Sequence, residues 1–254
     1  MLVLKSLIRA RRLRRERMPL PEDENFKEFL DLPTPKLIIF DCDGVLVDGE
    51  TLAMNAIIDF AKEQGLDLTE EMAEKHALGL ALPQVVKNLS KLAGKEFPAD
   101  SVPRLRKMFI QLAEKYAEPV TGANALLKRL NDANIPFRIG SNSSAKEMAV
   151  KFRASGLEDH IEDDNIHSAA DIGAPKPQPD VYLLAAEEEG VPPNECIVIE
   201  DSDPGALAAI RAGMRCIVLR PADQDEPPAF KKGVGVIAHS LKQVGDVIFK
   251  TLED

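Results

Sequence analysis

The sequence predicts an α/β fold, a doubly wound parallel sheet with an inserted α-helical segment. Short apolar runs without polar alternation are typical of strands buried on both faces of a parallel sheet. They span residues 36–40, 135–140, 196–200 and 215–219. Helical stretches that end in glycine, the usual C-terminal stop of a helix, alternate with these runs. They span residues 145–156, 179–190 and 203–213. Alternation of strand and helix indicates this fold class.

The stretch from residue 51 to about 119 interrupts the alternation, because it contains helical patterns and no strand-like run. We therefore expect a core domain formed by residues 36–50 and 120–254 and a helical cap domain over residues 51–119. We expect residues 1–35 to form a flexible basic extension. A chain of 254 residues is long enough for one core domain with a large insertion.

The composition excludes several classes of protein. Hydrophobic residues make up 44% and charged residues 29% of the chain, which is ordinary for a globular protein with a sizeable core. No apolar run approaches the roughly 20 residues that span a bilayer. Three cysteines without metal-like spacing argue against a disulfide framework and favour a cytoplasmic protein with reduced, packed thiols at Cys42, Cys196 and Cys216. The four histidines share no spacing and are assigned no ligand role.

The charge is uneven along the chain. Residues 1–17 carry a net charge of +6, so the total of −10 leaves −16 for residues 18–254. An acidic body argues against nucleic acid as the partner, and we expect a monomer or weak homodimer. Three interpretations of the basic arm stay open, namely a disordered or loosely helical tail, a targeting presequence, and a contact with a membrane surface or nucleic acid.

Acidic residues stand at the carboxyl ends of two predicted strands. Asp41 and Asp43 follow the first strand, and Glu200 and Asp201 close the third. The carboxyl ends of the strands meet at the edge of a doubly wound sheet where ligands bind. Neighbouring carboxylates repel each other unless a cation offsets their charge, and a cluster of carboxylate oxygens suits Mg²⁺. We expect Asp48, in contrast, to support the loop by hydrogen bonds.

Groups suited to a phosphoryl ligand stand near the same edge. Ser141 and Asn142 follow the second strand, and Lys176 lies in the loop before the helix at residue 179. Taken singly, each has an ordinary explanation as a helix cap or a solvated surface residue. Their joint placement beside two acidic strand ends favours a site for a phosphoryl group.

Four motifs resemble, in order, the signatures of the haloacid dehalogenase (HAD) superfamily. The first, "FDCDGVLVD", resembles the pattern DxDGxxxD, and "SNSS", "KPQPD" and "IEDSDPG" resemble the later motifs. The resemblance covers about residues 36 to 220. It implies a Rossmann-like core and a helical cap of the C1 type.

The resemblance also implies roles for individual residues. Asp41 resembles the nucleophile that forms an aspartyl-phosphate, and Asp43 resembles the acid and base that protonates the leaving alcohol and then activates water. Mg²⁺ would be held by Asp41, the backbone carbonyl of Asp43, Asp201 and, directly or through hydrogen bonds, Glu200. Ser141, Asn142 and Lys176 resemble the groups that bind the phosphoryl oxygens.

The departures from related sequences narrow the reaction. Haloacid dehalogenases and phosphonatase-like members lack the second aspartate, which this chain keeps as Asp43. β-Phosphoglucomutases carry a histidine where this chain has Ala53, which favours hydrolysis over mutase activity. The sequence most resembles the sugar phosphatases, including bacterial 6-phosphogluconate phosphatases. A β-phosphoglucomutase-like phosphotransferase and a non-catalytic binding module are the alternatives.

The expected cap determines the substrate. Its loop "HALGLALPQVV" corresponds to a loop that dips toward the active site in related proteins, and Lys75, His76 and Gln84 are its candidate polar groups. A role confined to packing the cap is an equally open interpretation of this loop. The loop has no obvious pair of arginines that could bind a second phosphate. We therefore expect the substrate to be a small phosphorylated sugar, sugar acid or polyol. We expect the hinges of the cap near Gly49 and residues 119–122.

Overall fold

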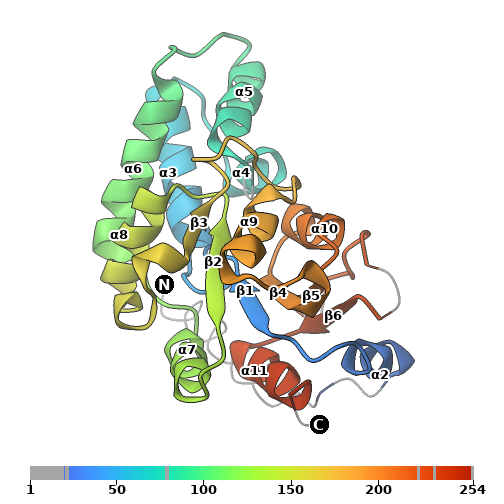
Figure 1. The fold of residues 1–254 in the computed structure, drawn as a ribbon. Coiled ribbons are helices and arrows are strands. Elements are labelled where there is room, and N and C mark those ends of the chain that lie inside the picture. Colours follow the sequence, from blue (N-terminus) through green and yellow to red (C-terminus); the bar gives the residue numbers. More distant parts are fainter. Residues whose placement is uncertain (1–19, 21–22, 78–79, 222–223, 231–232, 253–254) are drawn as a thin grey trace, which may run out of the picture.

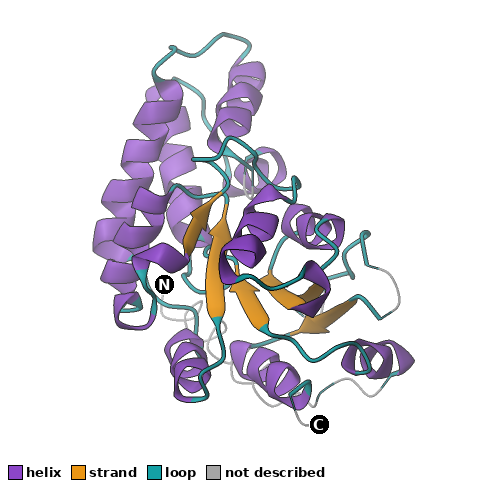
Figure 2. Ribbon diagram, viewed as in Figure 1, coloured by secondary structure: helices purple, strands orange, loops and turns teal. Residues whose placement is uncertain are grey.

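The computed structural model describes residues 20, 23–77, 80–221, 224–230 and 233–252, and it contains a six-stranded parallel sheet (Figures 1 and 2). The strand order is β3-β2-β1-β4-β5-β6. The strands are β1 (Leu37–Phe40), β2 (Phe137–Ser141), β3 (Ile166–Ser168), β4 (Cys196–Glu200), β5 (Arg215–Leu219) and β6 (Gly235–Ala238). The predicted fold class is confirmed, and the sheet gains β3 and β6, which were not predicted.

Helices cover both faces of the sheet. They are α7 (Ala123–Asp132), α8 (Ala145–Ser155), α9 (Asp180–Glu189), α10 (Asp203–Arg211) and α11 (Leu241–Lys250). Ile38 and Phe40 of β1 pack in one apolar cluster with α7, α8 and α11, whereas Leu37 and Ile39 pack in another with α9 and α10. Successive residues of a strand point to opposite faces, so a run without polar alternation is what two buried faces require.

The segment between β1 and α7 is helical. It contains α3 (Glu50–Glu63), α4 (Glu70–His76), α5 (Leu82–Ala93) and α6 (Ser101–Tyr116). Phe60, Leu89 and Leu105 belong to a separate apolar cluster of these helices, and α6 lies beside α8 (Figure 1). The helices therefore have a small core of their own and also rest on the sheet-bearing part through α6.

Both ends of this helical segment leave the sheet at one place. The backbone N–H of Asp48 donates to the carbonyl of Glu118 at 2.9 Å, and Val47 forms an isolated bridge with Pro119. The two expected hinge regions are therefore adjacent. Movement about them stays a prediction.

The N-terminal part of the described chain is not a free extension throughout. Helix α2 (Glu24–Leu30) packs against β6, and its Phe26 and Phe29 are buried. The Arg215 guanidinium donates hydrogen bonds to the backbone carbonyls of Phe29 and Pro33. Residues 24–30 of the expected extension are therefore a helix that two buried phenylalanines dock on the sheet-bearing part. Residues 1–19, with the basic arm, lie outside the described residues.

Within the described ranges, no helix is both long enough and apolar enough to span a bilayer.

Candidate active site at the carboxyl edge of the sheet

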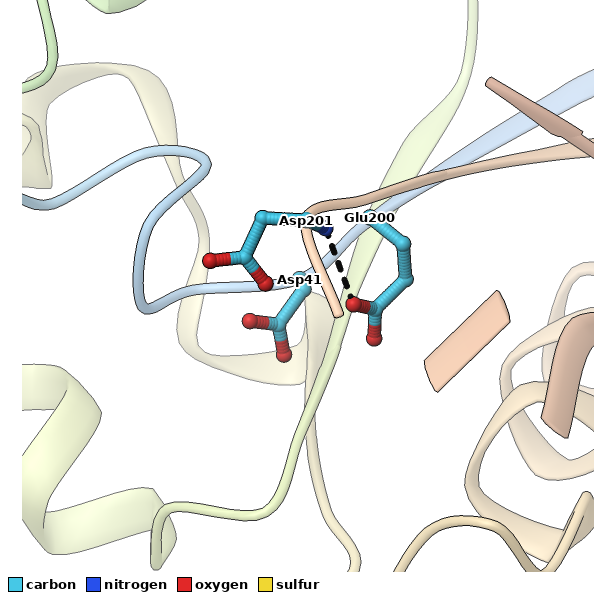
Figure 3. A group of neighbouring side chains, drawn as sticks. All are labelled: Asp41, Glu200 and Asp201. Atoms are coloured by element: carbon cyan, nitrogen blue, oxygen red, sulfur yellow. Dashed lines mark hydrogen bonds between the residues drawn. The ribbon is translucent and has the colours of Figure 1, made fainter. Parts of the chain in front are cut away.

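The predicted acidic cluster forms where β1 and β4 end side by side. The two strands pair through Phe40 and Ile199, and the backbone N–H of Asp41 continues the pairing by donating to the carbonyl of Ile199 at 2.9 Å. Asp41, Glu200 and Asp201 each bring a carboxylate oxygen within 4.8 Å of the others (Figure 3). The parallel pairing therefore brings together acids that lie far apart in the sequence.

Two glycines make room for these acids. A Cβ atom at Gly44 would lie 1.8 Å from Oδ2 of Asp201, and the φ of +77° at Gly44 is itself strained for a residue with a side chain. A Cβ atom at Gly205 would lie 1.8 Å from Oε1 of Glu200. The glycines of the first and fourth motifs thus allow the backbone to approach the carboxylates closely.

Lys176 bridges the cluster. Its Nζ donates to Oδ1 of Asp41 and to Oε1 of Glu200, both at 2.6 Å, and all three residues are buried. Burial alone would lower the pKa of Lys176, but the carboxylates of Asp41 and Glu200 outweigh burial and raise it. Lys176 is therefore a fixed positive charge that offsets the repulsion between the acids.

The two carboxyl groups that share Lys176 respond differently. Burial, with nearby Glu200 and Asp43, raises the pKa of Asp41 to about 7 even though Lys176 opposes the shift. Burial also acts on Glu200, but Lys176 and the hydroxyl of Tyr182 outweigh burial and lower its pKa. Of these two carboxyl groups, Asp41 is thus the one that takes up a proton more readily.

Glu200 is surrounded by hydrogen-bond donors. Oε1 accepts from Lys176 and from the hydroxyl of Tyr182, both at 2.6 Å. Oε2 accepts from the backbone N–H groups of Asp201 and Ser202 and from the Ser202 hydroxyl at 2.9 Å. Because both oxygens are engaged, Glu200 holds Lys176 and the turn after β4 in position.

The remaining donor set fits a magnesium ion. The carboxylates of Asp41 and Asp201 lie close together, and carboxylate oxygens are the ligands that Mg²⁺ prefers. The resident lysine contributes a single positive charge among three carboxylates, which leaves the group anionic.

The sequence did not predict the hydrogen-bond partners of Asp43. Its carboxylate accepts hydrogen bonds from Nζ of Lys151 at 2.8 and 2.7 Å and from the Ser143 hydroxyl at 2.8 Å. Lys151 is 4% exposed, whereas the Asp43 side chain is 35% exposed and lines the pocket. Burial lowers the pKa of Lys151, but Asp43 outweighs it and raises that pKa. Lys151 therefore fixes where the carboxylate of Asp43 lies.

The expected phosphoryl-binding residues line the same pocket. Ser141 ends β2, and its Oγ accepts from the backbone N–H of Ser143 at 3.2 Å. The Oδ1 of Asn142 accepts from the backbone N–H of Lys176 at 2.9 Å. In this arrangement Asn142 fastens the loop of Lys176, and its contact with a phosphoryl group stays a prediction.

The pocket has a volume of about 590 Å³ and reaches from the acids to the helical segment. Lys75, His76 and Gln84 do not line it. The Gln84 amide and the carbonyl of His76 instead bind the side chain of Asn88, and Lys75 is exposed. The loop itself reaches the pocket through apolar residues such as Ala77, Leu80 and Leu82, whereas these three polar residues lie outside the lining. Their contact with a substrate stays a prediction.

Glu74 and Arg106 are the charged side chains that the helical segment contributes to the pocket lining, within the described residues. Arg106 of α6 donates to Glu147 of α8 at 2.6 Å, across the contact between these helices. Glu147 also accepts from the backbone N–H of Ser144 in a capping box. Neither Glu74 nor Arg106 was predicted, because each lies in an ordinary amphipathic helix outside any motif.

The remaining residues named in the sequence analysis lie outside the catalytic cluster. Cys42, Cys196 and Cys216 are buried free thiols, as expected, and burial raises the pKa of each. Asp48 is exposed and lies outside the pocket lining.

Comparison with known proteins gives a consistent assignment. Residues 38–219 match the family described as haloacid dehalogenase-like hydrolase. The chain is 31% identical to hexitol phosphatase A of Escherichia coli (strain K12) over 227 residues, which cover 85% of this chain and 99% of that protein. It is 28% identical to the 6-phosphogluconate phosphatase of the same strain, covering 80% of this chain and 90% of that protein.

A solved structure shows the same fold. It is an HAD family hydrolase from Deinococcus radiodurans R1 with bound phosphate and sodium, which is 26% identical with a TM-score of 0.65. The match covers 86% of this chain and 97% of that one. The motifs, the fold and the matched residues agree, and the chain therefore belongs to the haloacid dehalogenase-like hydrolases.

Proposed function

We propose that the protein is a Mg²⁺-dependent phosphomonoester hydrolase that acts on a small phosphorylated sugar, sugar acid or polyol through an aspartyl-phosphate on Asp41. The observation that carries the proposal is the position of Asp41. It lies at the end of β1 in the lining of the 590 Å³ pocket, next to Lys176 and Asp201. The proposed nucleophile, a buried cation and a proposed metal ligand would thus share one cavity.

The residues divide the reaction into two steps. A carboxylate oxygen of Asp41 attacks phosphorus, and the bond from phosphorus to the alcohol oxygen breaks. Asp43, which has to be protonated for this step, donates its proton to the alcohol oxygen. Asp43 then takes a proton from water, whose oxygen attacks the same phosphorus. The bond between Asp41 and phosphorus breaks, and inorganic phosphate leaves.

Charge has to be balanced for an anionic nucleophile to meet an anionic ester. Ser141 and Lys176 would bind the phosphoryl oxygens, and Lys176 already offsets two carboxylates. Asp41, Asp201 and the backbone carbonyl of Asp43 would hold Mg²⁺, which supplies further positive charge at the phosphoryl group. Glu200 would act on the ion indirectly, because its oxygens are engaged by other donors.

The residue at position 53 supports hydrolysis over the mutase alternative. Ala53 lines the pocket and offers it only a methyl group, which can neither donate nor accept a proton. We therefore expect water to accept the phosphoryl group from Asp41.

The test is phosphate release from a panel of phosphorylated sugars, sugar acids and polyols, with Mg²⁺ or EDTA. The wild type is compared with Asp41→Asn, which removes the nucleophile at nearly constant volume. Asp59→Asn is the matched control, since Asp59 is exposed on α3 and does not line the pocket. We expect Mg²⁺-dependent release that Asp41→Asn abolishes and Asp59→Asn preserves. Release that survives in Asp41→Asn would contradict the mechanism.

A further inference from the structure

The pocket wall opposite the acids is mostly apolar. Within the described residues, α3, α5 and α6 contribute apolar side chains that include Ile57, Leu82, Val85 and Phe109. Charged groups on this wall come from Glu74 and Arg106. These two side chains are therefore where the wall can act electrostatically on the part of a substrate beyond the phosphoryl group.

The positive charge of Arg106 is already offset by Glu147, which lines the same pocket. Its guanidinium is paired at 2.6 Å with Glu147, whose side chain is 6% exposed. A substrate anion that took Arg106 away would leave this buried carboxylate without its counter-ion, which is costly. Glu147 would remain bound to Ser144 as the cap of α8, so it could not follow the arginine.

The other cations of the pocket are engaged in the same way. Lys151 pairs with Asp43, and Lys176 pairs with Asp41 and Glu200. Glu74, in contrast, has no hydrogen bond or ion pair with any described residue. The wall therefore presents one carboxylate that can accept hydrogen bonds and repels negative charge.

We infer that the substrate is a phosphomonoester whose organic part is uncharged and carries hydroxyl groups, and that Glu74 selects against a carboxylate or a second phosphate there. The inference rests on the proposed phosphatase function and narrows its substrate class. Glu74 accepts a hydroxyl hydrogen bond from the neutral part, while the apolar wall contacts its C–H groups.

A matched pair of substrates tests the inference. Hexitol 6-phosphate and 6-phosphogluconate have the same carbon chain and differ at C1, which is a neutral alcohol in one and a carboxylate in the other. We expect the wild type to have a kcat/KM about three- to tenfold higher for the hexitol ester, because Glu74 is exposed and water weakens the repulsion between two like charges. Added salt should reduce this ratio, because salt screens exposed charges.

The variant Glu74→Gln removes the charge and keeps the hydrogen-bond acceptor. We expect its ratio to fall about three- to tenfold, mainly because kcat/KM for 6-phosphogluconate rises. Glu71→Gln is the matched control, since Glu71 is exposed on the same helix and does not line the pocket, and its ratio should equal that of the wild type.

Hydrolysis of p-nitrophenyl phosphate is followed in parallel, because its leaving group makes little demand on the wall. A wild type that prefers 6-phosphogluconate, or a ratio unchanged in Glu74→Gln, overturns the inference while p-nitrophenyl phosphate hydrolysis upholds the phosphatase function. If none of the three esters is hydrolysed with Mg²⁺, the proposed function and the inference both fail.

Discussion

Lys151 and Asp43 form an ion pair whose strength can be measured by a double-mutant cycle. Lys151→Met keeps an unbranched side chain of similar length and removes the charge, and Asp43→Asn removes the other charge. The four proteins of the cycle isolate the pairwise term from the cost of each substitution. Equilibrium unfolding in urea with EDTA present excludes any contribution from bound metal.

The expected magnitude follows from the burial of the two partners. Removing one partner of a fully buried pair costs about 3–5 kcal/mol, because the other charge is left uncompensated. Lys151 is 4% exposed, but the Asp43 side chain is 35% exposed and regains water when the lysine is absent. We therefore expect a coupling free energy of about 2 kcal/mol, and Lys151→Met should lower the melting temperature by about 4–8 °C.

Lys146→Met is the matched control, because Lys146 is exposed on the same helix. We expect its free energy of unfolding to stay within about 0.5 kcal/mol of the wild type. A coupling energy below about 0.5 kcal/mol would refute the idea that Lys151 fixes the position of the Asp43 carboxylate.

Three further predictions concern the metal, the glycines and the N-terminal helix. Burial raises the pKa of metal-free Asp41 to about 7, so protons compete with Mg²⁺ for this carboxylate below that pH. Calorimetry should therefore show weaker Mg²⁺ binding at pH 6 than at pH 8, with release of protons, and equal affinities would contradict this. Gly205→Ala should abolish phosphate release, because its Cβ would lie 1.8 Å from Glu200 Oε1. The control Gly156→Ala has open space around its Cβ, so it should keep activity and cost about 1–2 kcal/mol of stability. Arg215→Met should speed amide hydrogen exchange in residues 24–30 without changing kcat, since it removes the bonds to the carbonyls of Phe29 and Pro33; unchanged exchange would show that the phenylalanines alone dock α2.

The strands that could be predicted from the sequence are those whose residues are apolar enough to indicate burial on both faces of the sheet. The runs that became β1, β2, β4 and β5 are apolar throughout or nearly so, and they form the four inner strands of the sheet. The edge strands β3 and β6 were missed. Three residues "IHS" and four residues "GVIA" are too short to show a period, and their pairing depends on neighbours distant in sequence.

The acidic cluster was predictable for a similar reason. Acids directly after buried strands must meet at one edge of a parallel sheet, so the order of residues alone was enough to place Asp41 and Asp201 together. Lys151, Tyr182 and Glu74 could not be placed in this way. Each lies inside a helix, where the sequence indicates the face only roughly and does not say which neighbour that face meets.

The adjacent crossings of Asp48 with Glu118 and of Val47 with Pro119 have a consequence for how this protein can be altered. Everything between residues 50 and 116 enters and leaves the sheet-bearing part through one narrow junction. Such a segment could be exchanged for another helical module without rethreading the sheet, as long as the new module keeps the contact of α6 with α8 and a partner for Glu147. The chain is therefore built so that the wall facing the substrate can be replaced as a cassette, while the strand ends that hold the acids stay as they are.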